Sequence, residues 1–164
     1  MKFIPYNYSR ELDIAKEALR QTEIRLEDMN GIASSADRRA MALASFYAAL
    51  ATFLATFAAN FAIIWVVYAC SVGFAVSAAL AIKSCMPRNF HVRGHYWHEW
   101  VGHISDCESY FDAIKSQAKE NDDRIDKNDA TLKSSGENVI LSYKCAGLSF
   151  LVLIISQILV ATSN

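Results

Sequence analysis

Hydrophobic positions in this chain fall into two long runs without charge. No Asp, Glu, Lys or Arg occurs between Arg39 and Lys83, and none occurs after Lys144. A bilayer core is crossed by roughly 20 apolar helical residues, so the first run predicts two spans, meaning membrane-crossing helices, and the second predicts one. One helix buried in soluble protein is the alternative for the first run. With 53% hydrophobic residues in 164, however, too little polar protein remains to cover such a helix.

The basic residues predict the orientation. All 16 Lys and Arg residues lie either before Ala40 or from Lys83 to Lys144. The positive-inside rule then places the N-terminus and the segment between the second and third spans in the cytoplasm, with the C-terminus outside. We therefore expect a multi-pass protein of the bacterial inner (cytoplasmic) membrane. The first residues have neither the apolar core nor the small-residue cleavage site of a signal peptide.

The pattern predicts an all-α membrane protein. A 3-4 alternation of apolar or small residues from Leu12 to Met29 predicts a helix that starts at Ser9 and ends at Asn30-Gly31. A new helix from Ser34 or Ser35 is expected to continue into the membrane. The predicted segments are a cytoplasmic N-terminal helix (1–32), a transmembrane hairpin with its turn near Asn60 (33–83), a cytoplasmic interfacial segment with a long helix (84–137), and a third transmembrane helix with a short tail (138–164).

A stripe in the long cytoplasmic helix alternates polar and apolar residues. Its central members are Asn121, Ile125, Asn128 and Leu132. Buried Asn at such positions costs stability but fixes register and oligomer number. One interpretation is a helix lying on a neighbouring helix of its own chain, and the other is self-association of several copies. The acidic residues on the remaining faces indicate a solvated surface, and no ligand is predicted for them.

The hairpin separates small from bulky residues. Small and hydroxyl-bearing side chains recur at helical spacing at Ala44, Ala48, Ala51, Thr52, Ala55, Thr56, Gly73 and Ser77. Such residues let helices approach closely and form interhelical hydrogen bonds, whereas Phe and Leu suit lipid. The small residues therefore pack the three helices of one chain or line an assembled pore. No span contains a carboxylate, histidine or arginine, which argues against a proton relay or coupled transport.

Residues of the membrane interface are expected at the ends of the spans and in the histidine-rich stretch after Pro87. They are Arg38, Arg39, Lys83, Trp97, Trp100 and Lys144. His95, His98 and His103 are weak candidates for metal binding, because their spacing matches no standard zinc motif. Anchoring of this stretch at the interface is the favoured interpretation, and pH sensing is the third.

The remaining composition restricts the function. A net charge of −1 gives no electrostatic attraction for nucleic acid, so no direct nucleic-acid binding is predicted. No nucleophile elbow, glycine-rich phosphate loop or paired catalytic motif is present, so we expect no enzymatic activity and no cofactor.

The layout resembles a known group of proteins. Ala36-Asp37-Arg38-Arg39-Ala40 leads into a close helical hairpin, Met86-Pro87-Arg88 follows it, and a long polar helix passes through Tyr143-Lys144 into a final span. This arrangement is similar to the transmembrane effectors of bacterial anti-phage systems, the Pycsar transmembrane effectors and the related SLATT-type effectors.

The resemblance implies a dormant inner-membrane effector that oligomerises and permeabilises or depolarises the membrane when a partner detects infection, an abortive-infection response. The implied partners are membrane lipid, further copies of the chain, and a cytoplasmic protein or second messenger from a neighbouring defence gene. The activating signal stays open among a cyclic nucleotide, a protein and a nucleic-acid complex. Two other classes also stay open: a non-conducting membrane anchor or inhibitor subunit for a cytoplasmic partner, and a lesion former like a phage holin.

Overall fold

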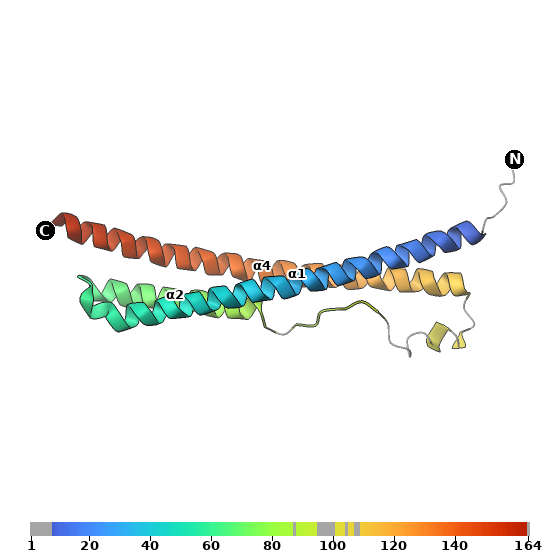
Figure 1. Ribbon diagram of the computed structural model, residues 1–164, viewed down its shortest axis with the longest axis horizontal. Helices are drawn as coiled ribbons and strands as arrows, with labels where there is room; N and C mark the ends of the chain where they lie inside the picture. Colours follow the sequence, from blue (N-terminus) through green and yellow to red (C-terminus); the bar gives the residue numbers. More distant parts are fainter. Residues whose placement is uncertain (1–7, 87, 95–100, 104, 107–108, 164) are drawn as a thin grey trace. The chain divides into compact units, whose positions relative to one another are not determined.

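The protein is almost entirely helical. The computed structural model describes residues 8–86, 88–94, 101–103, 105–106 and 109–163, and 90% of it is helix with no strand among these residues. The elements are α1 (Tyr8–Phe57), the 3-10 turn η1 (Ala58–Asn60), α2 (Ile64–Ser84) and α4 (Tyr110–Ser163), as Figure 1 shows. By length and composition, α1 with the adjoining turn, α2 and α4 can each cross a membrane. The predicted all-α class and the presence of three apolar helices are therefore confirmed.

Helix α1 continues through Asn30 and Gly31, so the predicted helix end at this pair is wrong. A glycine inside a helix costs about 1 kcal/mol relative to alanine. A break would instead leave up to four backbone N–H groups and four carbonyls without helical partners at the new ends. Gly31 has no neighbour within 4 Å of an added Cβ, so no close approach of another segment requires a glycine there. The small propensity cost is outweighed, and the helix continues.

The chain divides into two compact units, to which α1 and α4 each contribute one part. We call Met1–Ala33 with Asn89–Thr131 the charged unit, and Ser34–Arg88 with Leu132–Asn164 the apolar unit.

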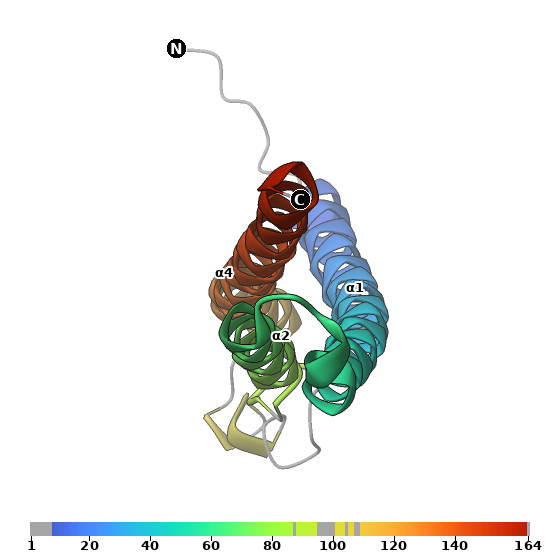
Figure 2. The same cartoon turned by 90° about the vertical axis from the view of Figure 1, so that its left-hand side faces the viewer.

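The apolar unit packs α1, α2 and α4 around a core of small and apolar residues. Figure 2 shows α2 beside the C-terminal part of α1, joined to it by η1. The backbone N–H of Phe61 donates to the carbonyl of Ala58 (3.2 Å) and closes the turn. Serine hydroxyls add contacts between helices: Ser71 donates to the carbonyl of Ala51 (2.7 Å). The core cluster comprises Tyr47, Ala51, Leu54, Ala58, Val67, Cys70, Phe74, Ala78 and Ala146.

The charged unit buries amide side chains beside apolar ones. Leu26 of α1 is fully buried, and so are Ile114, Gln117, Asn121 and Asn128 of α4 within 2% exposure. The spacing of these α4 residues, three, four and seven apart, keeps them on one face of the helix. This unit therefore combines an apolar interior with buried amides.

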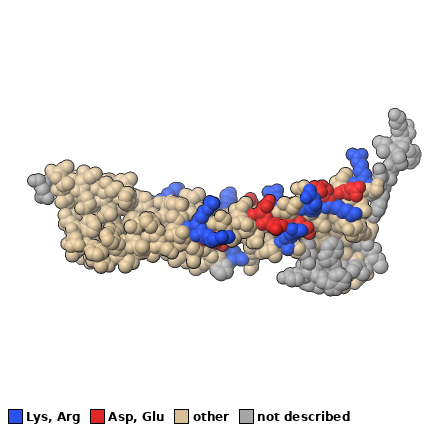
Figure 3. All heavy atoms as spheres, in the orientation of Figure 1, with Lys and Arg blue, Asp and Glu red and all other residues tan. Residues whose placement is uncertain are grey.

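The two units differ in the side chains that they expose. On the face shown in Figure 3, Lys, Arg, Asp and Glu gather over the charged unit, and a large area of the apolar unit has none. The apolar unit has bulky side chains that are more than half exposed, such as Phe46, Phe53, Trp65, Val72, Leu148, Leu151 and Leu159. Bulky apolar side chains with no protein cover are what lipid solvates.

Candidate functional site

The membrane part of α1, together with the adjoining turn η1, presents three strips. One strip is buried in the apolar unit and contains Ala40, Ala44, Tyr47, Ala51, Leu54 and Ala58. A second, exposed strip is small and hydroxyl-bearing; we call it the small strip, and it consists of Ser45, Ala48, Ala49, Thr52, Ala55, Thr56 and Ala59. The third strip is bulky and includes Phe46, Phe53 and Phe57, which are 57%, 52% and 45% exposed.

The structure thus divides the alanines that the sequence placed together. Ala44 and Ala51 are buried, whereas Ala48 and Ala55 are exposed. Tyr47 and Leu54 explain the division, because these larger side chains fill the space against the neighbouring helices and centre the buried face on themselves.

The hydroxyls of the small strip are satisfied within α1. Ser45 donates to the carbonyl of Met41 (3.0 Å), Thr52 to that of Ala48 (2.9 Å) and Thr56 to that of Thr52 (2.9 Å). Each donor is used, while the oxygen keeps acceptor capacity. The strip can therefore face lipid, another helix or water without leaving a donor unpaired.

Gly73 and Ser77 pack inside the chain. Ser77 is fully buried, its hydroxyl donates to the carbonyl of Gly73 (2.9 Å), and its own carbonyl accepts a hydrogen bond from Ser142 (2.8 Å). A Cβ added at Gly73 would collide with the side chain of Ser149. These two residues bring α2 and α4 close together and do not line an open surface.

The basic residues predicted for the interface are exposed. Arg38, Arg39, Lys83 and Lys144 all belong to the apolar unit and have exposed side chains. Trp97 and Trp100 lie outside the described residues.

An aromatic pair beyond the turn was missed. Trp65 is 80% exposed, and its ring centroid lies 6.5 Å from that of Tyr68 in the first turns of α2. Trp and Tyr are enriched where a span meets the headgroups. The signal was available, since Trp65 follows the expected turn at Asn60 by one helical turn or so.

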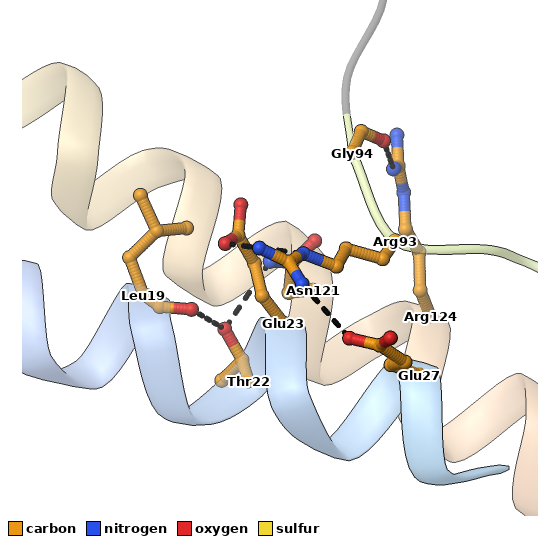
Figure 4. Close-up of polar contacts among 8 residues, drawn as sticks. All are labelled: Leu19, Thr22, Glu23, Glu27, Arg93, Gly94, Asn121 and Arg124. Carbon is orange, nitrogen blue, oxygen red and sulfur yellow. Dashed lines mark hydrogen bonds and ion pairs between the residues drawn. The ribbon is translucent and has the colours of Figure 1, made fainter.

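The charged unit contains a segment held by polar contacts, residues 89–94, which we call the strap. Asn128 of α4 binds the backbone of His91 on both sides: its Nδ2 donates to the His91 carbonyl (2.7 Å), and its Oδ1 accepts from the His91 N–H (2.9 Å). Arg93 of the strap lies between two carboxylates of α1, 2.8 Å from Glu27 and 3.7 Å from Glu23. Figure 4 shows the guanidinium reaching these two side chains.

The polar stripe on α4 faces the interior of its own chain, which is the first of the two interpretations given above. Asn121 donates to the hydroxyl of Thr22 (3.2 Å), whose own hydroxyl donates to the carbonyl of Leu19 (2.9 Å; Figure 4). Asn121, Ile125 and Asn128 are buried and Leu132 is half-buried. The side chains of Asn121, Ile125 and Asn128 therefore pack within the charged unit.

The histidines do not form a metal cluster among the residues that the structure describes. His95 and His98 lie outside those residues. His103 is half-buried, and its Nε2 lies 3.0 Å from Nε2 of Gln117, a buried residue of α4. His103 therefore contacts an amide of the charged unit.

Comparisons of the chain with protein-family models, with curated proteins and with solved structures find no match.

Proposed function

We propose that this chain is a membrane effector that assembles through the small strip of α1 and permeabilises or depolarises the bacterial inner membrane. The observation that carries the proposal is the exposure of this strip: seven small or hydroxyl-bearing residues in a candidate span are exposed along one face. Small residues at a helix surface permit close approach of another helix, and their hydroxyls are wetted at little cost.

The same geometry supports assembly over lipid contact for the small strip. The bulky strip with Phe46, Phe53 and Phe57 already offers a surface for lipid, and so do the exposed leucines and isoleucines of α4. A surface of alanine and threonine offers lipid less apolar contact area, but it allows the backbone of another helix to approach closely. Copies packed through this strip would turn their hydroxyl oxygens towards each other or towards a central water column.

The setting that we propose is anti-phage defence, with the N-terminus in the cytoplasm and the C-terminus outside. The resemblance in layout to the Pycsar and SLATT-type effectors supports it. In this scheme the protein is not an enzyme, and a partner from a neighbouring gene acts on the charged unit and shifts the packing of the apolar unit. Such a trigger works only through different affinities for the resting and assembled states.

The test is membrane potential and dye entry in bacteria that express the full chain, with blue-native sizing of the extracted protein. Ala48→Leu with Ala55→Leu places two branched side chains on the small strip, and we expect it to abolish both the large oligomer and depolarisation while insertion stays normal. Ala51 is left unchanged, because it is buried and its carbonyl binds Ser71.

Ala75→Leu is the matched control, since Ala75 is exposed on α2 and lies outside the small strip. Full depolarisation by the small-strip variant would rule out the strip as the assembly face. If the chain alone is silent, the same variants are compared with the neighbouring genes co-expressed.

The second candidate function is a non-conducting anchor for a cytoplasmic partner. The strap and the charged surface around it favour this function, because they form a site for polar contacts outside the spans. An anchor predicts tolerated expression and unchanged membrane potential under all conditions, including co-expression with the neighbouring genes.

A further inference from the structure

The strap is held mainly through its backbone. Asn128 satisfies both the N–H and the carbonyl of His91, at 2.9 and 2.7 Å, as a neighbouring β-strand would. The side-chain amide of Asn128 is fully buried on α4, so its position is fixed by the helix. A contact of this kind recognises an extended peptide whatever side chain His91 carries.

Two further contacts give the strap a sequence preference. Two residues after His91, the Arg93 guanidinium meets Glu27 at 2.8 Å and Glu23 at 3.7 Å, so a basic residue is selected there. Gly94 follows with a φ of 97°, a conformation that favours glycine, and its carbonyl accepts a hydrogen bond from Arg124 (3.3 Å). Arg124 also pairs with Glu120 at 2.7 Å, which orients its guanidinium. Figure 4 shows the Arg93 and Arg124 contacts on opposite sides of the strap.

The strap contributes little to the apolar interior. Val92 is 56% exposed, and the side chains of Arg93 and Glu27 are 53% and 64% exposed. Exposed ion pairs add little stability, and segments with few buried apolar contacts open locally at low free energy. A competing ligand can therefore displace the strap at a low cost in free energy.

We propose that the surface beneath the strap, formed by Glu23 and Glu27 of α1 and by Arg124 and Asn128 of α4, is a binding site for an extended partner segment with an Arg-Gly pair. We call this surface the strap site, and the strap is its built-in competitor. The partner segment would place the residue two before its arginine against Asn128 and the arginine between the two carboxylates. The inference identifies a partner class for the charged unit, and it holds or fails whether or not the apolar unit conducts.

The test is binding of a fluorescein-labelled peptide Asn-Phe-His-Val-Arg-Gly, the sequence of the strap, to the full-length chain in nanodiscs, read by anisotropy. His91→Pro with Arg93→Ala removes one backbone N–H and the guanidinium from the strap and leaves the residues of the strap site unchanged. Because the site is then more often open, this strap variant should bind the peptide at least tenfold more tightly than the wild type. Val92→Ala is the matched control in the strap and should match the wild type.

Substitutions in the strap site distinguish specific peptide binding from non-specific adsorption of the peptide. Adding Asn128→Ala to the strap variant should weaken binding at least tenfold, and so should a peptide with alanine in place of its arginine. Glu27→Arg should restore binding to a peptide that carries glutamate in that place. Far-UV circular dichroism and unchanged reconstitution establish that each variant is folded.

The proposal is overturned if the strap variant does not bind the peptide, or if binding survives Asn128→Ala. It is also overturned if the strap variant self-associates instead of binding, since a second copy would then be the occupant. Depolarisation measured in parallel in bacteria reports on the proposed effector function alone, so failure of one idea is distinguished from failure of the other.

Discussion

The two units of this protein are stabilised by different kinds of side chain, although α1 and α4 contribute to both. Among the most deeply buried residues, the charged unit has Leu26, Ile114 and Gln117, and the apolar unit has Val67, Ser77 and Ser142. Water drives large apolar side chains into the interior of the charged unit. Lipid provides no such drive between helices, so the apolar unit depends on van der Waals packing of its aromatic and aliphatic core, on close backbone approach and on hydroxyl contacts. One helix can therefore be packed by different interactions in different parts of its length.

The polar contacts differ in the same way. In the charged unit, amides and ion pairs join segments far apart in the sequence, as Asn128 joins His91 and Arg93 joins Glu27. In the apolar unit, a serine hydroxyl donates to a carbonyl of a neighbouring helix, as Ser142 does to Ser77. A hydroxyl adds one short polar contact without bringing charge into the membrane. We therefore test the charged unit by removing side-chain volume and the apolar unit by adding it, and expect a loss of stability in each case.

Removing volume should damage the charged unit most. Leu26→Ala leaves a cavity at a fully buried site and loses the transfer free energy of the removed carbons, so we expect the free energy of unfolding to fall by about 2–5 kcal/mol. Denaturant unfolding of the full chain in micelles, followed by hydrogen exchange of the α1 amides, measures the loss.

Ile14→Ala is the matched control, because Ile14 is 60% exposed on the same helix and should change stability little. Equal losses for the two variants would contradict the assignment of Leu26 to a water-excluded interior.

Adding volume should damage the apolar unit. Gly73→Val would force its side chain against Ser149, whose Cβ lies 3.1 Å from the position of an added Cβ, and overpacking of this kind costs about 1–3 kcal/mol. The measurement is the thermal unfolding midpoint in micelles together with cysteine cross-linking between α2 and α4. Gly147→Val, at a glycine with nothing within 4 Å of an added Cβ, is the control and should leave the contact between α2 and α4 intact. An unchanged midpoint for Gly73→Val would show that the two helices have room to spare.

The helical class and the three apolar helices were predictable because the absence of charge over two long runs admits few other structures. The continuation of the helix through Asn30-Gly31 was not predictable. Local propensity favours a helix end at this pair, and only the free-energy cost of unsatisfied backbone groups at two new helix ends opposes it. The small residues of α1 were recognised, but Ala51 and Ala55 could not be assigned to different surfaces until the neighbours of Tyr47 and Leu54 were known.

The strap was the least predictable feature. No periodicity marks residues 89–94, and the partners of Arg93 lie more than sixty positions earlier in the chain. The polar stripe did indicate that Asn121 and Asn128 are unusual, because amides at the helical spacing of buried residues need hydrogen-bond partners. Which partners they find depends on how the chain returns from α2, and the sequence pattern does not encode this return.

Acid should loosen the charged unit slightly and leave the uncharged spans unaffected. A hydrogen bond from Arg20, helped by one from Gln21, lowers the pKa of Glu17 from its ordinary value of 4.5 to about 2. Because the folded state holds the carboxylate in its ionised form, this contact contributes stability above about pH 4.5, and the contribution is lost as the pH falls through about 2. The side chains of Glu17 and Arg20 are 52% and 59% exposed, so solvent and salt screen the pair and the effect should be the smallest of the three. A carboxyl-carbon NMR titration measures the pKa directly, and Arg20→Ala should return it towards 4.5. A titration midpoint that stays near 2 in that variant would mean that another group holds the carboxylate, and the ion pair would then be removed from the account of the charged unit.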